Sequence, residues 1–349
     1  MDSVTQAVLG AGISGVMLGG RFGRKAYIAG AVLATLPDLD VVLDYGNPLA
    51  NMIHHRGFSH SVFVLTALAI VLTLALRRFA ALRQMHGGRL FTALWLTLVT
   101  HPLLDAFTSY GTQLFWPLRP VPTSLSSIFI IDPFYTVPLL VAVLAALLRG
   151  ATPGTARLSA AALALSTAYL ATSWGVKQYV EHKVSRQLAQ DGVVVTDIFS
   201  TPQPFSILLW RVVAKSNDDH YHEIITGLLD DRRGEHIALP LNTNLAQSVA
   251  HDPMLQGLQW FSGNWLRYDA IDRHLVVTDL RMGLGAGYYS FRFNIANWHG
   301  SNPGWETVTP TRWPSGRDLD SVKLVVRRII DEQPPLPLKQ WEGRMDANR

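Results

Sequence analysis

The stretch SVFVLTALAIVLTLAL, at residues 61–76, carries no charged residue and is rich in Leu, Val and Ala. Crossing the hydrocarbon layer of a membrane takes about 20 apolar residues, or fewer where the bilayer thins. Other stretches of the first half are similarly apolar. Together, the expected membrane helices lie at roughly 5–20, 26–43, 60–76, 90–107, 133–148 and 158–180. The sequence therefore predicts a membrane α-helical bundle of about six spans.

The charged residues divide the chain into two parts of different composition. They make up 16% of the 349 residues, compared with about 25% in a typical soluble domain. Residues 1–183 hold 13 Lys and Arg and 7 Asp and Glu, whereas residues 184–349 hold 17 and 19. Because so few charges cannot coat a soluble domain, we expect a transmembrane helical domain over 1–183 and a separate soluble domain over 184–349.

The second half has the pattern of a β-rich domain. Its alternating apolar stretches lie at Val193–Ile198, Ser206–Val213, Glu223–Leu229, His274–Leu280 and Tyr288–Phe293. Turn signals rich in Pro, Gly, Asn and Asp separate them, among them Gly283–Gly287. We therefore expect a β-rich α+β domain, followed by a polar, Pro-rich and loosely ordered tail from about residue 331.

The composition also excludes several classes of function. The isoelectric point near 9.4 comes from the apolar half rather than from a basic patch on a soluble domain, so we expect no nucleic-acid partner. The chain has no cysteine, which excludes thiol catalysis, cysteine-ligated zinc and disulfide bonds.

The basic residues of the first half gather at alternate ends of the expected helices. The linkers after the first, third and fifth helices carry nine basic and no acidic residues, whereas all seven acidic residues lie at the opposite ends. Lys and Arg mark the cytoplasmic loops of membrane proteins. We therefore expect the N-terminus and everything after about residue 180 to be extracytoplasmic.

Polar residues that could carry chemistry gather on that outer side. The motif Pro37–Asp40 (Pro-Asp-Leu-Asp) ends the second expected helix, and a proline there can bend the chain so that both carboxylates converge. Three histidines, His54, His55 and His60, crowd beside a glycine at the start of the third helix and are good ligands for a divalent metal. The alternatives are a solvated helix end for the aspartates and helix caps for the serines beside the histidines.

The fourth expected helix ends with His101 and Asp105, which are four residues apart and therefore share a helix face. A simple hydrogen bond between them is the alternative. Asp132, before Pro133, is interpreted as an ordinary helix cap. Because all these helix ends fall on one side, we expect them to bind one or two divalent ions, and zinc and manganese both suit a site without thiolates. The predicted metal ligands are Asp38, Asp40, His55, His60, His101 and Asp105.

The motifs and their order resemble those of a known family. They are Met-Asp-x-x-Thr at Met1–Thr5, Pro-Asp-Leu-Asp at Pro37–Asp40, His-Arg-Gly-Phe-Ser-His-Ser at His55–Ser61, His-x-x-x-Asp at His101–Asp105 and Thr-Ser-Tyr-Gly-Thr-Gln-Leu-Phe-Trp-Pro at Thr108–Pro117. Over about residues 1–140 this pattern is similar to that of the YdjM/YbcI-type inner-membrane proteins. The resemblance implies a bacterial inner (plasma) membrane location and a metal-dependent hydrolase activity. Members often carry a His where this chain has Gln6, so the resemblance implies one ligand fewer here, or an amide oxygen in its place.

These observations lead to one preferred function. We expect a membrane-bound metal-dependent hydrolase in which His54 and Arg56 serve as a proton shuttle or as a clamp for a substrate anion. A site at the edge of the lipid bilayer favours a lipid or lipid-linked substrate, such as a phosphoester.

The alternatives are non-enzymatic. A transporter, scaffold or assembly factor could bind metal without turnover, and its outer domain would bind a partner. A transporter should carry ionisable residues near the middle of the bilayer, whereas here they lie at helix ends. The sequence therefore favours the hydrolase over the transporter.

Overall fold

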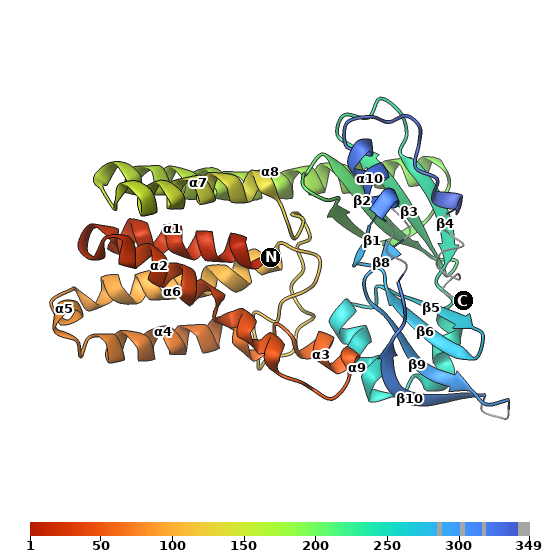
Figure 1. The fold of residues 1–349 in the computed structure, drawn as a ribbon. Coiled ribbons are helices and arrows are strands. Elements are labelled where there is room, and N and C mark those ends of the chain that lie inside the picture. Colours follow the sequence, from red (N-terminus) through yellow and green to blue (C-terminus); the bar gives the residue numbers. More distant parts are fainter. Residues whose placement is uncertain (285–287, 301–303, 316–318, 341–349) are drawn as a thin grey trace. The chain divides into compact units, whose positions relative to one another are not determined.

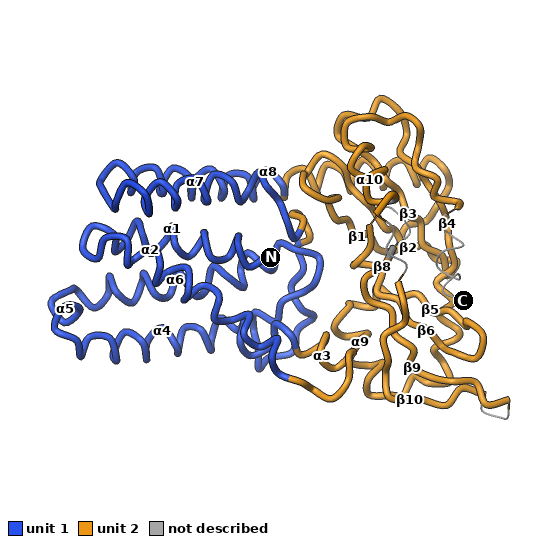
Figure 2. The backbone as a smooth tube through the Cα atoms, in the orientation of Figure 1, with its two compact units in different colours: residues 1–43, 55–125, 130–173 blue, residues 44–54, 126–129, 174–349 orange. Residues whose placement is uncertain are grey.

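The computed structural model describes residues 1–284, 288–300, 304–315 and 319–340. The chain forms two compact units that are not continuous in sequence (Figure 2). Unit 1 comprises Met1–Leu43, His55–Leu125 and Ile130–Ser173, and unit 2 comprises Asp44–His54, Ser126–Phe129 and the chain from Trp174 onward. The boundary expected after residue 183 falls inside one long helix, α8 (Pro153–Gln190), which contributes to both units.

Unit 1 is a bundle of helices that run side by side (Figure 1). The main helices are α1 (Ser3–Phe22), α2 (Arg24–Thr35), α4 (Val62–Leu76), α6 (Gly87–Ala106), α7 (Pro133–Arg149) and the first part of α8. Short helical segments connect them, namely η1 (Pro37–Val42), η2 (Phe58–His60) and α5 (Ala80–Arg83). Each expected apolar stretch of the first half thus contains a helix of this bundle.

Glycines let α1 and α2 approach closely. A Cβ atom on Gly10 would lie 2.6 Å from the carbonyl oxygen of Gly30, and one on Gly15 would lie 2.2 Å from the ring of Tyr27. Contacts this short leave no room for a side chain. Small residues at a helix interface permit the close packing that is common among membrane helices.

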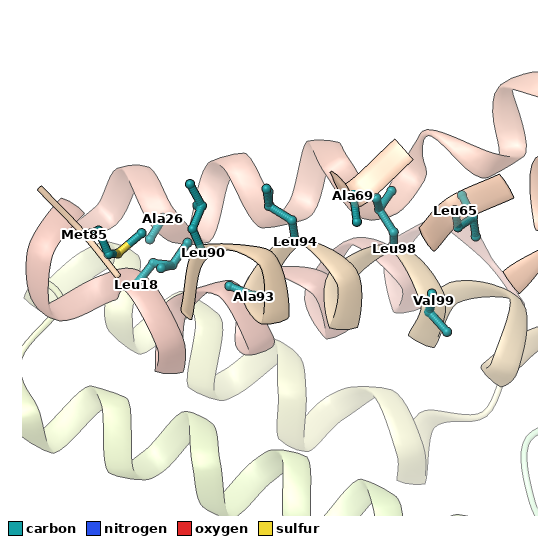
Figure 3. Packing of buried hydrophobic residues seen from close by; sticks show 10 residues of the cluster. All are labelled: Leu18, Ala26, Leu65, Ala69, Met85, Leu90, Ala93, Leu94, Leu98 and Val99. Carbon is teal, nitrogen blue, oxygen red and sulfur yellow. The ribbon is translucent and has the colours of Figure 1, made fainter. Parts of the chain in front are cut away.

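The apolar core of unit 1 lies between α1, α4 and α6 (Figure 3). Leu90, Leu94 and Leu98 follow one another at intervals of four residues, so they project from one face of α6. Leu65 and Ala69 of α4 belong to the same buried cluster. This packing holds α4 beside α6 and so fixes the helix ends that carry the candidate site.

The expectation of about six membrane-spanning helices is wrong. In the described part of the chain, one helix, α1, is long and apolar enough to cross a membrane, or two when the bent pair Pro48–His60 and Val62–Leu76 counts as a span. The physical reason is helix length and polarity. At about 1.5 Å per residue, the 12 residues of α2 reach roughly 18 Å, short of a hydrocarbon layer of about 30 Å. The 20 residues of α6 include Arg89, His101 and Asp105, which make this helix too polar.

Unit 2 is β-rich and contains two four-stranded antiparallel sheets. The first sheet has the order β1-β2-β3-β4, formed by Val195–Pro202, Leu209–Ser216, His220–Gly227 and Glu235–Pro240. The second has the order β10-β9-β6-β5, formed by Trp305–Arg312, Arg292–Trp298, His274–Asp279 and Leu266–Ile271. A short pair joins β7 (Gly283–Leu284) to β8 (Tyr288–Tyr289).

The helical segments of unit 2 are α3 (Pro48–His54), η3 (Thr243–Val249), α9 (Pro253–Ser262) and α10 (Leu319–Arg328), together with the last part of α8. The β-rich α+β character expected for the second half is therefore observed. Of the expected turn at Gly283–Gly287, residues 285–287 lie outside the described residues.

A buried ion pair lies within unit 2. Arg211 donates from Nε and Nη2 to the two carboxylate oxygens of Glu223, at 2.9 and 2.8 Å. The hydroxyl of Tyr289 accepts from Arg211 and donates to Glu223, and the carbonyl oxygen of Leu280 accepts a further bond from Arg211. Both charges are thus paired and hydrogen-bonded, which buried charges require.

The described part of the expected tail, up to residue 340, packs against the rest of unit 2. Leu336 and Leu338 are buried in one cluster with Leu209 and Ile225. The backbone N–H of Leu336 also donates to Glu235 at 3.0 Å. Residues 341–349 of the loosely ordered tail predicted from about residue 331 lie outside the described residues.

Candidate metal centre

Four side chains from separate segments of unit 1 meet at one end of the bundle. Asp38 lies on η1, His60 ends η2, and His101 and Asp105 lie near the end of α6. One atom of each, either an imidazole nitrogen or a carboxylate oxygen, lies within 4.8 Å of the other three. His60, His101 and Asp105 are buried, and 25% of the Asp38 side chain is exposed. These four residues, called the Asp/His group from here on, could hold a metal ion.

The two imidazole Nε2 atoms face both carboxylates. His60 Nε2 lies 3.5 Å from Asp38 Oδ1 and 3.3 Å from Asp105 Oδ2. His101 Nε2 lies 3.3 and 3.4 Å from the same two oxygens. Burial alone would raise the pKa of Asp38, but the imidazoles of His101 and His60 beside it outweigh burial and lower the pKa below its usual value. This carboxylate therefore stays ionised, as a metal ligand must be.

Several buried polar atoms around the Asp/His group have no hydrogen-bond partner among the described residues. They are His60 Nε2, Asp105 Oδ2, Arg56 Nε and Gln6 Oε1. An unsatisfied buried polar atom costs about 1–3 kcal/mol, so several at one place are unfavourable unless something else satisfies them. A divalent cation would satisfy the imidazole nitrogen and the carboxylate oxygen, and both are common metal ligands. The residues present therefore fit a metal ion.

Neighbouring groups orient the two histidines. His101 Nδ1 lies 2.6 Å from the carbonyl oxygen of Ala34, so this nitrogen donates and Nε2 faces the carboxylates. Ser59 Oγ donates to Asp40 Oδ2 at 2.7 Å and lies 2.9 Å from His60 Nδ1, from which it accepts. Histidines that bind metals usually donate their second N–H in this way. The nearness of Ser59 to His60 in the chain is the only sequence signal for this contact.

Asp40 and His55 form a neighbouring pair instead of joining the Asp/His group. His55 Nδ1 lies 2.9 Å from Asp40 Oδ1, and the backbone N–H of Arg56 donates to Asp40 Oδ2 at 2.9 Å. Burial alone would raise the pKa of Asp40, but hydrogen bonds with His55 and Ser59 lower it below its usual value. The His55 ring lies edge-on to that of His60, with centroids 6.0 Å apart, and 26% of the His55 side chain is exposed. This pair therefore combines contact with the Asp/His group and access to solvent.

Arg56 points into the bundle. Its Nε lies 3.3 Å from Asp105 Oδ2, its Nη1 donates to Thr108 Oγ1 at 3.3 Å, and its guanidinium carbon lies 5.0 Å from the centroid of the Tyr110 ring. The backbone of Arg56 has a φ of 62°, in the left-handed region that residues other than glycine rarely adopt. Such strain often marks functional sites. The guanidinium is therefore held against Asp105 inside the protein.

Gln6 supports the same carboxylate. Its Nε2 donates to Asp105 Oδ1 at 3.1 Å and to the carbonyl oxygen of His101 at 3.2 Å. The α-amino group of Met1 also contacts Asp105 Oδ1. Gln6 therefore reaches Asp105 through its amide nitrogen, while its amide oxygen is one of the unsatisfied atoms named above.

Two other residues singled out in the sequence lie outside the Asp/His group. His54 ends α3 of unit 2, and its ring centroid lies 4.7 Å from that of Tyr45. Asp132 caps α7, because its Oδ1 accepts from the backbone N–H groups of Phe134 and Tyr135. The ligand roles of the six predicted residues, and the catalytic roles of His54 and Arg56, stay predictions.

The fold and this site define a protein with a helical bundle, a buried group of two His and two Asp at one end of it, and a β-rich second part. The chain belongs to the family of YdjM inner membrane proteins, whose family model matches residues 1–180, just over half of its length. The resemblance found in the motifs is thus confirmed, and with it the assignment to the inner membrane.

Two curated relatives share part of the chain. The uncharacterized protein YfhP of Bacillus subtilis (strain 168) is 32% identical over 170 residues, which cover 46% of this chain and 50% of that protein. The inner membrane protein YbcI of Escherichia coli (strain K12) is 35% identical over 98 residues, which cover 26% of this chain and 52% of that protein. The chain thus spans about half the length of the curated relatives it matches. No solved structure matches it significantly.

Proposed function

We propose that this inner-membrane protein is a metal-dependent hydrolase whose Asp/His group holds a divalent zinc or manganese ion. The observation that carries the proposal is the meeting of Asp38, His60, His101 and Asp105 around buried, unsatisfied ligand atoms. A divalent ion bound there would lower the pKa of a bound water and polarise a phosphoryl oxygen. The chain has no cysteine, so nitrogen and oxygen ligands are what it offers such an ion.

In this proposal, His55 moves protons at the site. Asp40 accepts from His55 Nδ1 and so holds the ring in one orientation, which leaves Nε2 to exchange a proton. His55 is partly exposed and lies edge-on to His60, whereas His54 belongs to unit 2. The role that the sequence suggested for His54 is therefore better suited to His55. Arg56 would balance the charge of Asp105.

The proposed substrate is a lipid or lipid-linked phosphoester. Large apolar side chains are exposed on the segments that carry the site residues, including Val41 and Val42 on η1 and Phe58 on η2. The Phe58 ring lies edge-on to that of Trp116, which is also exposed, with centroids 6.3 Å apart. Exposed apolar and aromatic residues are typical of surfaces that contact lipid. They support a substrate with an acyl or prenyl chain.

The proposed orientation places the Asp/His group on the outer side of the membrane. Arg21, Arg24 and Arg89 all donate to backbone carbonyl groups at the end of the bundle where α1 finishes. Asp105 instead contacts Gln6, near the start of α1. Because Lys and Arg favour the cytoplasmic side, the basic end faces the cytoplasm and the C-terminal β-rich part is extracytoplasmic. Alkaline phosphatase fused after Arg349 should then be active, and activity of a reporter that works only in the cytoplasm would contradict this orientation.

The hydrolase proposal is tested with the full chain in detergent, loaded with zinc or manganese. The probes are bis(4-nitrophenyl) phosphate, a phosphodiester, and 4-nitrophenyl phosphate, a phosphomonoester. Turnover by the wild type and by His220→Ala, but not by His60→Ala, would support the proposal, because His220 lies on β3 outside the Asp/His group. A protein that retains metal but turns over neither these probes nor phospholipid vesicles would favour the non-enzymatic alternative.

A further inference from the structure

A pocket on unit 2 has the chemistry of an anion site. It has a volume of about 280 Å³ and is lined by Tyr179, His182, Lys183, Arg186, Gln187 and Gln190 of α8 and by Arg233 from the connection between β3 and β4. Each of these side chains offers an N–H or O–H donor, and none is negatively charged at neutral pH. A wall made of donors and cations favours an anionic ligand.

Two of the cations are held in place by other parts of unit 2. Lys183 Nζ donates to Thr226 Oγ1 of β3 at 3.1 Å. Arg233 donates from Nη1 to Asp191 Oδ1 at 2.8 Å and from Nη2 to Gln190 Oε1 at 3.3 Å. Side chains that are already ordered lose less conformational entropy when a ligand binds. Two of the pocket's cationic side chains are therefore preorganised for a ligand.

The positive charges of the pocket are only partly neutralised. Asp191 balances Arg233, whereas Lys183 and Arg186 are three residues apart on α8 and so lie next to each other on the helix surface. The nearby Asp230 is paired with Arg328 at 2.7 Å. Like charges at this helical spacing repel each other and weaken a helix. A bound anion would remove this repulsion.

We propose that this pocket binds the phosphate group of a small phosphoester or of a phospholipid headgroup. The planar guanidinium of the exposed Arg186 can donate two parallel hydrogen bonds to phosphate oxygens, and Lys183 supplies a second, compact charge. Ligand pockets usually measure about 300–1,000 Å³, so this one suits a small molecule or a headgroup rather than a polymer. The proposal is independent of the Asp/His group and of the proposed hydrolase activity.

The test is titration calorimetry of the full chain in detergent at low salt. A chelator is present, so that the Asp/His group holds no metal and cannot bind phosphate through it. Inorganic phosphate, glycerol 3-phosphate and monomeric dihexanoyl phosphatidylglycerol are the probes. Binding should weaken at least tenfold in Arg186→Gln and in Lys183→Gln, and Arg186→Lys should recover part of it because it restores the charge without the planar fork. Raising the salt concentration should weaken wild-type binding.

The control is Arg232→Gln, which removes the same charge one residue from Arg233 but outside the pocket lining. The affinity of this variant for the three probes should stay within twofold of the wild-type affinity. Binding of phosphatidylglycerol alone would identify a lipid headgroup as the source of the phosphate, and binding of glycerol 3-phosphate at least as tight as that of phosphatidylglycerol would identify a soluble phosphoester. Absence of binding by the wild type, or equal weakening in Arg232→Gln and Arg186→Gln, would overturn the proposal.

Discussion

Asp38 and Asp105 face the same two imidazole nitrogens, although they lie on different segments of unit 1. Asp38 Oδ1 and Asp105 Oδ2 each lie between 3.3 and 3.5 Å from Nε2 of His60 and Nε2 of His101. Two carboxylates this close repel each other, and a divalent cation bound to them and to the two imidazole nitrogens would remove that repulsion. The loss of any of these four side chains should therefore affect the whole Asp/His group.

Replacing His60 or Asp105 by Ala should remove bound metal while the protein stays folded. Changes to residues that merely support a ligand lower metal affinity about 10–100-fold, so the loss of a ligand should cost at least as much. Elemental analysis of the purified variants, beside thermal melting, measures this. Asp44→Ala is the control, because Asp44 is exposed and accepts hydrogen bonds from the backbone N–H of Gly46 and from Asn51, outside the Asp/His group. Equal metal content in the wild type and both variants would end the metal-site hypothesis.

Replacing Ser59 by Ala should weaken metal binding about tenfold, because Ser59 orients His60 and bonds to Asp40. Competition with a chelating dye measures the affinity. Ser61→Ala is the matched control, because Ser61 caps α4 and donates to the carbonyl oxygen of Trp116. That variant should lose about 1 kcal/mol of stability and keep its metal affinity. A similar loss of affinity in both serine variants would show that Ser59 has no specific role.

Replacing Gly30 by Ala should destabilise the bundle, because the new Cβ would lie 2.3 Å from the carbonyl oxygen of Gly10. Forcing an extra methyl group into such a contact typically costs about 1–3 kcal/mol. Gly20→Ala is the control, since a Cβ there meets nothing within 4 Å and alanine favours a helix. The melting temperature measured in detergent should therefore fall for Gly30→Ala and stay equal or rise for Gly20→Ala. The reverse order would contradict the close α1–α2 contact.

Replacing Glu223 by Gln should destabilise unit 2 by about 3–5 kcal/mol, because it leaves the buried charge of Arg211 without its partner. Denaturant unfolding of the full chain measures the loss. The double variant Arg211→Met/Glu223→Leu should lose less, since it removes both charges together. Lys323→Gln breaks an exposed salt bridge with Asp320, and it should change the free energy of unfolding very little. A double variant less stable than Glu223→Gln would contradict this account.

The contribution of Asp230 to stability should depend on pH. Burial alone would raise its pKa, but hydrogen bonds from Arg328 and the backbone of Gly227 outweigh it and lower the pKa below the usual 3.8. A carboxyl group whose pKa is lower in the folded state stabilises the fold above its unfolded pKa. This stability is lost as the pH falls through the folded value. The melting temperatures of the wild type and Asp230→Asn should therefore differ clearly at pH 7 and converge below pH 3. A difference in melting temperature that is the same at both pH values would show that the ionised Asp230 carboxylate does not stabilise the fold.

The residues of the Asp/His group could be found from the sequence because polar residues stand out in an apolar chain. His101 and Asp105 are the simplest case, because a spacing of four residues puts both on one helix face whatever surrounds them. Asp38 was recognisable as an acid beside a proline that interrupts a helix. The number of membrane spans could not be predicted in this way. Apolar composition predicts where helices form, but α2 begins after Gly23 and ends before Pro37, so it is too short to cross a bilayer.

By itself, the sequence determined the approximate positions of the helices of unit 1 and the β-rich nature of the second half, and it named six candidate ligands that include the four residues of the Asp/His group, because these depend on local periodicity and side-chain chemistry. Only the tertiary structure decided that His60 joins Asp38, while His55 pairs with Asp40 and His54 lies in unit 2. The physical reason is that neighbouring side chains diverge when the backbone turns between them. The left-handed conformation of Arg56 makes such a turn, and long-range contacts such as the bond from Arg56 to Asp40 hold it in place.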